Sequence, residues 1–282
     1  MASWSFDEEQ FAALWYGPAN DRMLYPLHYL SQFGHVNERD RHWAQIRHEY
    51  SEQGRLSWNE ADLLRRAFAV LTDPEVWAEI HGVSQQAGPI RVAAARHDRH
   101  AALAMQFTRR SRIEVSITAA DRLPDRLAML LPEQSPGTRA AEAFAAADLY
   151  PERQPILRYT GESTPLQRYR RLVRRPAGGA GVITVFRGPR RQGLRSPRKV
   201  GTMRWYDIDD DGRYMETGSR TLTVRPADAA SVRGAITRLL DHALLEYREY
   251  VEDLGEFARQ RVVDALPRPT RESARNPTPP TA

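Results

Sequence analysis

Residues 113–131 read IEVSITAADRLPDRLAMLL, and residues 222–240 read LTVRPADAASVRGAITRLL. In each stretch, apolar residues first alternate with polar ones, as in a half-buried strand, and then recur at helical spacing. The apolar positions coincide when the stretches are placed 109 residues apart, since 222 − 113 = 109. The matching pairs are Ile113 and Leu222, Val115 and Val224, Leu123 and Val232, Leu127 and Ile236, Leu130 and Leu239, and Leu131 and Leu240. This fixed spacing predicts an internal duplication of a strand–helix unit.

The segments before these two stretches follow one common order. Strands are expected over 76–83, 90–95, 101–107, 182–186, 200–208 and 213–217. Helices are expected from the capping boxes at Ser5 and Ser57, and over 37–50, 138–147 and 164–174. A four-stranded unit with an exposed edge is marginal alone, so we expect two copies to join their sheets. The predicted fold class is therefore α+β, with a central antiparallel β-sheet flanked by helical bundles and a pseudo-two-fold internal repeat.

The predicted domain covers residues 1–265 and consists of two similar halves, about 1–134 and 135–265. A chain of 282 residues can bury a sizeable core without a disulfide or metal. The helix from Asp228 is expected to continue past Leu240 as far as Leu254. Residues 266–282 are rich in proline and polar residues, which predicts a disordered tail.

The composition excludes several kinds of protein. The sequence has no cysteine, which rules out disulfides, thiolate metal sites and a cysteine nucleophile. The acidic N-terminal segment resembles no signal peptide, and no apolar run approaches the roughly 18 residues that a membrane span needs. We therefore expect a cytoplasmic protein with no membrane insertion.

Three motifs could carry chemistry, and each has a simpler interpretation. Asp207–Gly212 resembles the start of a calcium loop, but Gly218 stands where the loop needs a glutamate, so an acidic hairpin turn is expected. His97 and His100 lack a third metal ligand. Gly178–Gly181 precedes a strand instead of following one, so a flexible loop is expected and not a phosphate cradle. No catalytic residue, metal, cofactor or small-molecule substrate is predicted, and the protein is not expected to be an enzyme.

The basic residues are concentrated in one stretch. The net charge is +5, and no aspartate or glutamate occurs from Ser163 to Tyr206. Such a stretch could bind phosphates, so nucleic-acid binding through residues 163–206 is the alternative function. A solvated helix face followed by a basic loop is favoured, because no aromatic interleaving or helix-turn-helix pattern accompanies the charge.

Bulky apolar residues form the candidate partner-binding surface. They come from the 200–208 strand, its hairpin partner and the long last helix, and they are Met203, Trp205, Tyr214, Met215, Leu244, Tyr247 and Val251. The corresponding hairpin of the first half is mostly alanine, which favours binding on one half only. The alternative is that Met203 and Trp205 belong to the core, where large apolar residues are usually found.

The chain also resembles the EspG family, the cytosolic chaperones of type VII secretion in actinobacteria. The resemblance covers about residues 6–240. The motifs that carry it are, in order, FAALW (11–15), YPL (25–27), NERDR (37–41), WYD (205–207) with DDGRY (210–214), and VRPAD (224–228). It implies a pseudo-symmetric fold that binds the apolar helical tip of PPE proteins within PE–PPE pairs and keeps these substrates soluble for export. The surface implied for binding includes the sheet and the C-terminal helical bundle. PE–PPE-like proteins are thus the expected partners, and the sequence leaves a homodimer open.

Overall fold

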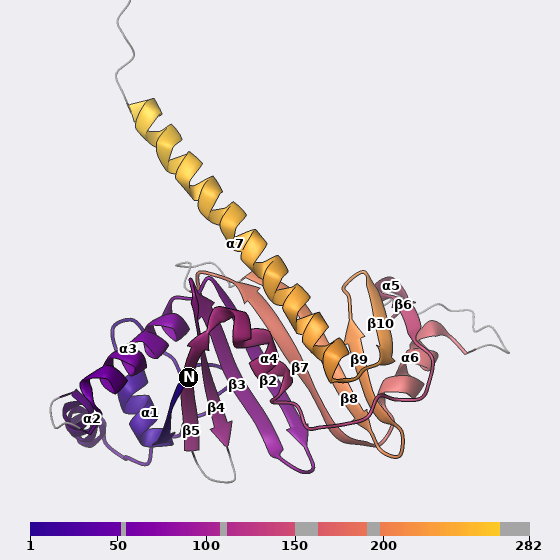
Figure 1. The fold of residues 1–282 in the computed structure, drawn as a ribbon, viewed down its shortest axis with the longest axis horizontal. Helices are drawn as coiled ribbons and strands as arrows, with labels where there is room; N and C mark the ends of the chain where they lie inside the picture. Colours follow the sequence, from indigo (N-terminus) through magenta and orange to yellow (C-terminus); the bar gives the residue numbers. More distant parts are fainter. Residues whose placement is uncertain (52–54, 108–111, 150–162, 191–197, 266–282) are drawn as a thin grey trace, which may run out of the picture. The chain divides into compact units, whose positions relative to one another are not determined.

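The structure is a computed structural model that describes residues 1–282 except 52–54, 108–111, 150–162, 191–197 and 266–282; the side chains of 256–265 are also outside the description. Ten strands of the described residues form a single antiparallel sheet (Figure 1). The strands are β1 (Ala2–Asp7), β2 (Val76–Ser84), β3 (Gly88–His97), β4 (His100–Phe107), β5 (Arg112–Ala119), β6 (Glu142–Ala145), β7 (Ala177–Arg187), β8 (Arg198–Ile208), β9 (Gly212–Thr217) and β10 (Thr221–Pro226). The helices are α1 (Glu8–Trp15), α2 (Val36–Ser51), α3 (Trp58–Thr72), α4 (Leu123–Ala128), α5 (Ala146–Leu149), α6 (Pro165–Val173) and α7 (Ala229–Ala265).

The strand order is β1-β5-β4-β3-β2-β7-β8-β9-β10-β6. Counted outward from the β2–β7 pair, the first half runs β2, β3, β4, β5 and ends with β1. The second half runs β7, β8, β9, β10 and ends with β6. In each half, the outermost strand is therefore the one that comes first in the sequence. The join itself is a long antiparallel pair in which Ile80 lies opposite Ile183. The predicted α+β class with a central antiparallel sheet is confirmed. The strand order is the one that a duplication would produce, and the duplication itself stays a prediction.

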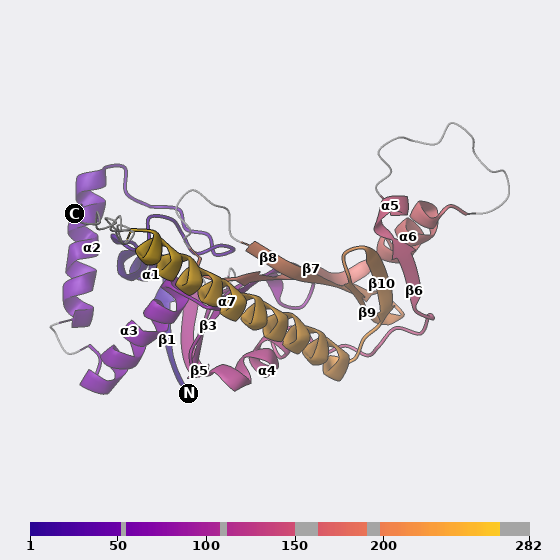
Figure 2. The ribbon, with the colours of Figure 1, turned by 90° about the horizontal axis from the view of Figure 1, so that it is seen from above.

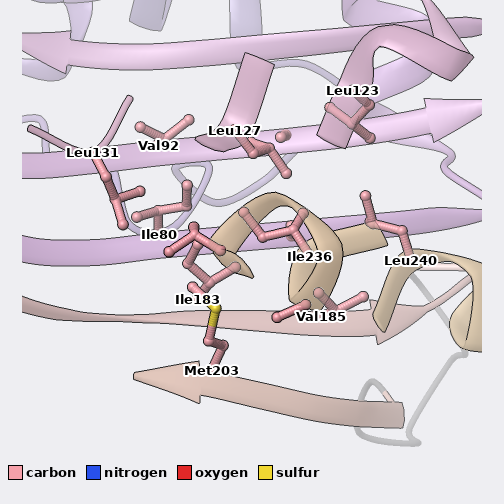
Figure 3. Close-up of a cluster of buried hydrophobic side chains, with 14 of the residues drawn as sticks. Ile80, Val92, Leu123, Leu127, Leu131, Ile183, Val185, Met203, Ile236 and Leu240 are labelled. Atoms are coloured by element: carbon pink, nitrogen blue, oxygen red, sulfur yellow. The ribbon is translucent and has the colours of Figure 1, made fainter. Parts of the chain in front are cut away.

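Helices cover both faces of the sheet, but unequally. On one face, α4 and the first part of α7 pack against β2, β3, β4, β7 and β8, and Figure 3 shows Leu127, Ile236 and Leu240 above these strands. On the other face, α1 and α3 pack on the first half of the sheet. The helices α5 and α6 pack on the second half of that face. The middle of this second face therefore lies between two groups of helices.

Most predicted elements are present, and three predictions were wrong. Ser5 lies in β1, where Trp4 and Phe6 point into the core, and the α1 capping box is formed by Asp7 and Gln10 instead. The alanine-rich 138–147 segment forms β6 at its centre, because Phe144 is buried beside α6 and the backbone pairs with β10. Gly178–Gly181 is part of β7, not a flexible loop.

The contacts within the chain divide it inside α7, into residues Met1–Tyr247 and Arg248–Ala282. In the first unit, Val232, Ile236 and Leu240 of α7 are buried against the sheet. In the second, Val251 and Leu254 are exposed. The predicted domain over 1–265 stays a prediction, and the predicted tail, 266–282, lies outside the described residues. No helix of the described residues is long and apolar enough to cross a membrane.

Candidate partner-binding surface

In the middle of the sheet, β2, β7 and β8 lie side by side. Within the described part of residues 1–247, helices cover this region on one face only. Ile80, Ile183 and Met203 point toward α4 and α7. Side chains alternate along a strand, so their neighbours point to the other face. These neighbours, which we call the open face, are His81, Val83, Val182, Thr184, Thr202 and Arg204. In Figure 2, no helix of the described part of residues 1–247 lies against this side of β7 and β8 between the two helical groups.

The open face mixes apolar and polar side chains in register. His81, Val182 and Arg204 lie opposite one another across the three strands. His81 and Arg204 are exposed, Val182 is half-buried, and the side chain of Val83 is 55% exposed. Interfaces of partners that bind and later separate have this mixed composition, with an apolar centre and a polar rim. The surface is therefore suited to reversible protein binding.

A buried carboxylate fixes one rim of the open face. Glu216 of β9 is 2% exposed and accepts hydrogen bonds from three side chains. Its Oε2 accepts from the hydroxyls of Tyr169 (2.8 Å) and Tyr206 (2.9 Å), and its Oε1 accepts from Nη1 of Arg204 (2.7 Å). Burial and the nearby Glu216 carboxylate raise the pKa of Tyr206 far above its usual value. The network ties α6 to β8 and β9 and holds two tyrosines at the rim.

The opposite rim is the irregular segment around Tyr25. Leu24 and Leu27 are buried, and the Tyr25 ring, 57% exposed, lies 6.4 Å from the His81 ring. Gln106, itself buried, holds the segment from below: its Oε1 accepts from the backbone N–H of His28 (2.8 Å), and its Nε2 donates to the His28 carbonyl (2.6 Å). Two hydrogen bonds between the side-chain amide of Gln106 and the backbone of His28 thus attach this rim to β4 and fix its position.

Stacked side chains close one end of the open face. The rings of Trp77 and Phe186 stack at 4.9 Å, and the Arg190 guanidinium lies 5.0 Å from the Trp77 ring centroid. Burial lowers the pKa of Arg190 to about 10, so the side chain stays charged at neutral pH. Burial also raises the pKa of Glu79, whose Oε1 accepts a 3.3 Å hydrogen bond from Nε1 of Trp77. Trp77, Phe186, Arg190 and Glu79 thus pack together at this end of the open face.

Four of the predicted surface residues are in the core, so their assignment to an exposed surface was wrong. Met203, Trp205 and Met215 are fully buried beneath α4 and α7, and Tyr214 is 1% exposed beneath α6. The physical reason is alternation along β8: the bulky apolar side chains face the core, so Arg204 faces outward. The sequence carried this signal, since Met203 and Trp205 alternate with Arg204 and Tyr206.

The other three predicted residues lie on α7. Leu244 and Tyr247 are half-buried, and Leu244 packs against the core beneath α7. Val251 is 47% exposed and belongs to the second unit of the chain. A role for these residues in binding stays a prediction.

The acidic motif forms the expected β8–β9 hairpin turn, with Asp210 in the left-handed conformation. The Asp211 carboxylate is bound by other residues of the protein. Nη1 of Arg175 lies 2.5 Å from its Oδ2, and the backbone N–H of Thr138 donates to its Oδ1. Burial opposes ionisation, but these hydrogen bonds prevail and hold the pKa of Asp211 below its usual range. Nδ1 of His97 lies 2.7 Å from the Asp73 carbonyl. Within the described residues, no three histidines or carboxylates gather as a metal site would require.

The fold and the open face together define a protein that presents a sheet surface between two helical groups. A model of the EspG family matches residues 7–238, and the chain therefore belongs to the EspG family. Among solved structures, the fold is similar to the type VII secretion system chaperone EspG5 of Mycobacterium tuberculosis in complex with the PE25–PPE41 dimer, with a TM-score of 0.55 and 13% sequence identity. The similarity covers 86% of this chain and 96% of EspG5. No curated protein sequence matches the chain significantly.

Proposed function

We propose that this chain is a cytoplasmic type VII secretion chaperone that binds the apolar helical tip of a PE–PPE-like substrate on its open face. The observation that carries the proposal is the family match over residues 7–238, in a fold whose described helices pack to either side of the middle of one sheet face. EspG5, which shares the fold, was solved with a PE–PPE dimer bound. Covering an apolar tip would remove a patch that otherwise drives association of the substrate.

The geometry of the open face supports protein binding. Val83 and Val182 supply an apolar floor, and aromatic side chains stand on both rims, Tyr25 on one and Tyr206 on the other. Tyrosine is enriched at the energetic centres of protein interfaces, because it buries a large ring at little cost in rotamer entropy. We infer that the protein acts by holding its substrate.

The test is a photo-crosslinking amino acid placed at His81, on the open face, in the native host. We expect PE–PPE peptides to be crosslinked and identified by mass spectrometry. The same amino acid at Arg238, which is exposed on α7, is the matched control. Equal crosslinking at the two positions, or another class of protein at position 81, would contradict the proposal.

A single substitution gives an independent check. Val83→Asp places a charge on the floor of the open face at a side chain that is 55% exposed, so folding should be unaffected. We expect affinity for the co-purified substrate to fall roughly tenfold, because the carboxylate would be desolvated against an apolar tip. Isothermal titration calorimetry measures the loss, and Val36→Asp, at an exposed valine of α2, is the control.

A further inference from the structure

The basic stretch of the sequence has a definite place in the fold. Its first part forms α6, on the rim of the open face. Nε of Arg168 lies 3.7 Å from Oε2 of Glu142, in the outermost strand of this half, so Arg168 faces the outer edge of the sheet. Arg170 is about 200° further round the helix, and Arg174 follows one turn later. Arg170 and Arg174 therefore project from the flank that faces the middle of the sheet.

These two arginines carry uncompensated charge. Both are exposed, and neither forms an ion pair with a described residue. Arg204, on the open face beside α6, is paired with Glu216 but is still 45% exposed. Two acids on this side are withdrawn from the surface, because Glu216 is bound by three donors and Glu79 is half-buried. A third, Asp209, is exposed beside Gly178, and its backbone N–H donates to the Pro176 carbonyl (3.0 Å). The open face and its α6 rim thus present a positive surface around an apolar floor.

We infer that the partner segment seated on the open face carries carboxylates beside its apolar tip, and that Arg170 and Arg174 attract them. The inference rests on the proposed function and adds the charge of the substrate to it. A guanidinium binds a carboxylate through two parallel hydrogen bonds, which gives orientation as well as attraction.

The arrangement favours a protein over a nucleic acid. Phosphate contacts supply essentially all of non-specific DNA binding, and a protein with a strongly salt-dependent affinity makes roughly six to ten of them. The described residues here offer Arg170 and Arg174 without ion pairs, the exposed Arg171 beside them on α6, and the half-paired Arg204. They stand next to the exposed apolar side chain of Val83. A few positive charges around an apolar floor match an apolar protein tip that is flanked by carboxylates. They are too few to neutralise the phosphates along a nucleic-acid backbone.

The experiment measures association kinetics with the PE–PPE heterodimer that co-purifies with the chain. Exposed charges act mainly on the association rate, and salt screens them over about 10 Å at 0.1 M. We expect the double variant Arg170→Glu and Arg174→Glu to associate roughly tenfold more slowly at about 0.05 M salt, with the difference lost near 0.5 M. The dissociation rate should change little, which a general loss of structure would not reproduce.

The control carries the same change of charge elsewhere: Arg65→Glu on α3 together with Arg238→Glu on α7, both at exposed positions. Its association rate should stay within about twofold of wild type. Equal rates for wild type and both variants would overturn the inference and leave the chaperone function standing. Tight binding of a short duplex DNA, lost in the Arg170/Arg174 variant while heterodimer binding is kept, would overturn it in favour of a nucleic acid. Absence of a crosslink from position 81 to the heterodimer would instead contradict the proposed site itself.

Discussion

At the residue scale, Trp205 is a core anchor. Its side chain is fully buried. Gly82 of β2 and Gly181 of β7 make room for the ring, because a Cβ added to Gly82 would lie 2.7 Å from it and one added to Gly181 would lie closer still. Trp205→Ala should therefore lower the free energy of unfolding by about 3–5 kcal/mol, measured by urea denaturation. Thr202→Ala, on the open side of the same strand, should cost less than about 1 kcal/mol. If Trp205→Ala kept wild-type stability but lost substrate binding, the prediction would be wrong, and Trp205 would belong to the binding surface.

At the same scale, Tyr206 should make the stability of the fold depend on pH. Its folded pKa is raised above the ordinary 10.0, by burial and then by Glu216. Above about pH 10, the folded state therefore keeps a proton that the unfolded chain releases. The contribution of Tyr206 to the free energy of unfolding is complete below about pH 10 and is lost as the pH rises further. Tyr206→Phe cannot ionise, and its stability should fall less steeply between about pH 10 and 11, by up to about 1 kcal/mol.

At the element scale, the sequence predicts what local patterns decide. The Ser57 capping box and the alternation of the central hairpins were sufficient to find α3, β2–β4 and β8–β10. It fails where tertiary contacts override local preference: the alanine-rich segment around Phe144 becomes an edge strand because β10 offers a partner. Alternation located the bulky residues of β8 but not which side α7 would cover. The open face could be found only once that side was known.

The last helix allows a prediction at the same scale. The residues of α7 that pack on the sheet end at Leu244, the first compact unit ends at Tyr247, and the family match ends at 238. A chain shortened to residues 1–247 should therefore keep its cooperative thermal unfolding, with a midpoint within a few degrees, about 4 °C, of the full chain. If binding of the substrate is also kept, Val251 has no role in it. A large loss of stability would show that residues after 247 support the core.

At the scale of the whole molecule, the two halves share one core. Ile80 and Leu103 of the first half and Ile183, Ile236 and Leu240 of the second belong to the same buried cluster. Separating the halves would expose that cluster together with the facing edges of β2 and β7.

We therefore expect residues 1–134 and 135–265, each produced alone, to aggregate or to remain unfolded. Produced together, they should form a one-to-one complex, because the β2–β7 ladder and the packing of α7 on the first half can re-form without the peptide bond between them. Co-purification and light scattering measure this, and Ile80→Asp in the first fragment, which buries a charge at the join, should abolish the complex. A half that is monomeric and unfolds cooperatively by itself would mean that the symmetric strand order reflects two independent domains, and that the uncovered sheet between the helical groups is not held in place by a shared core.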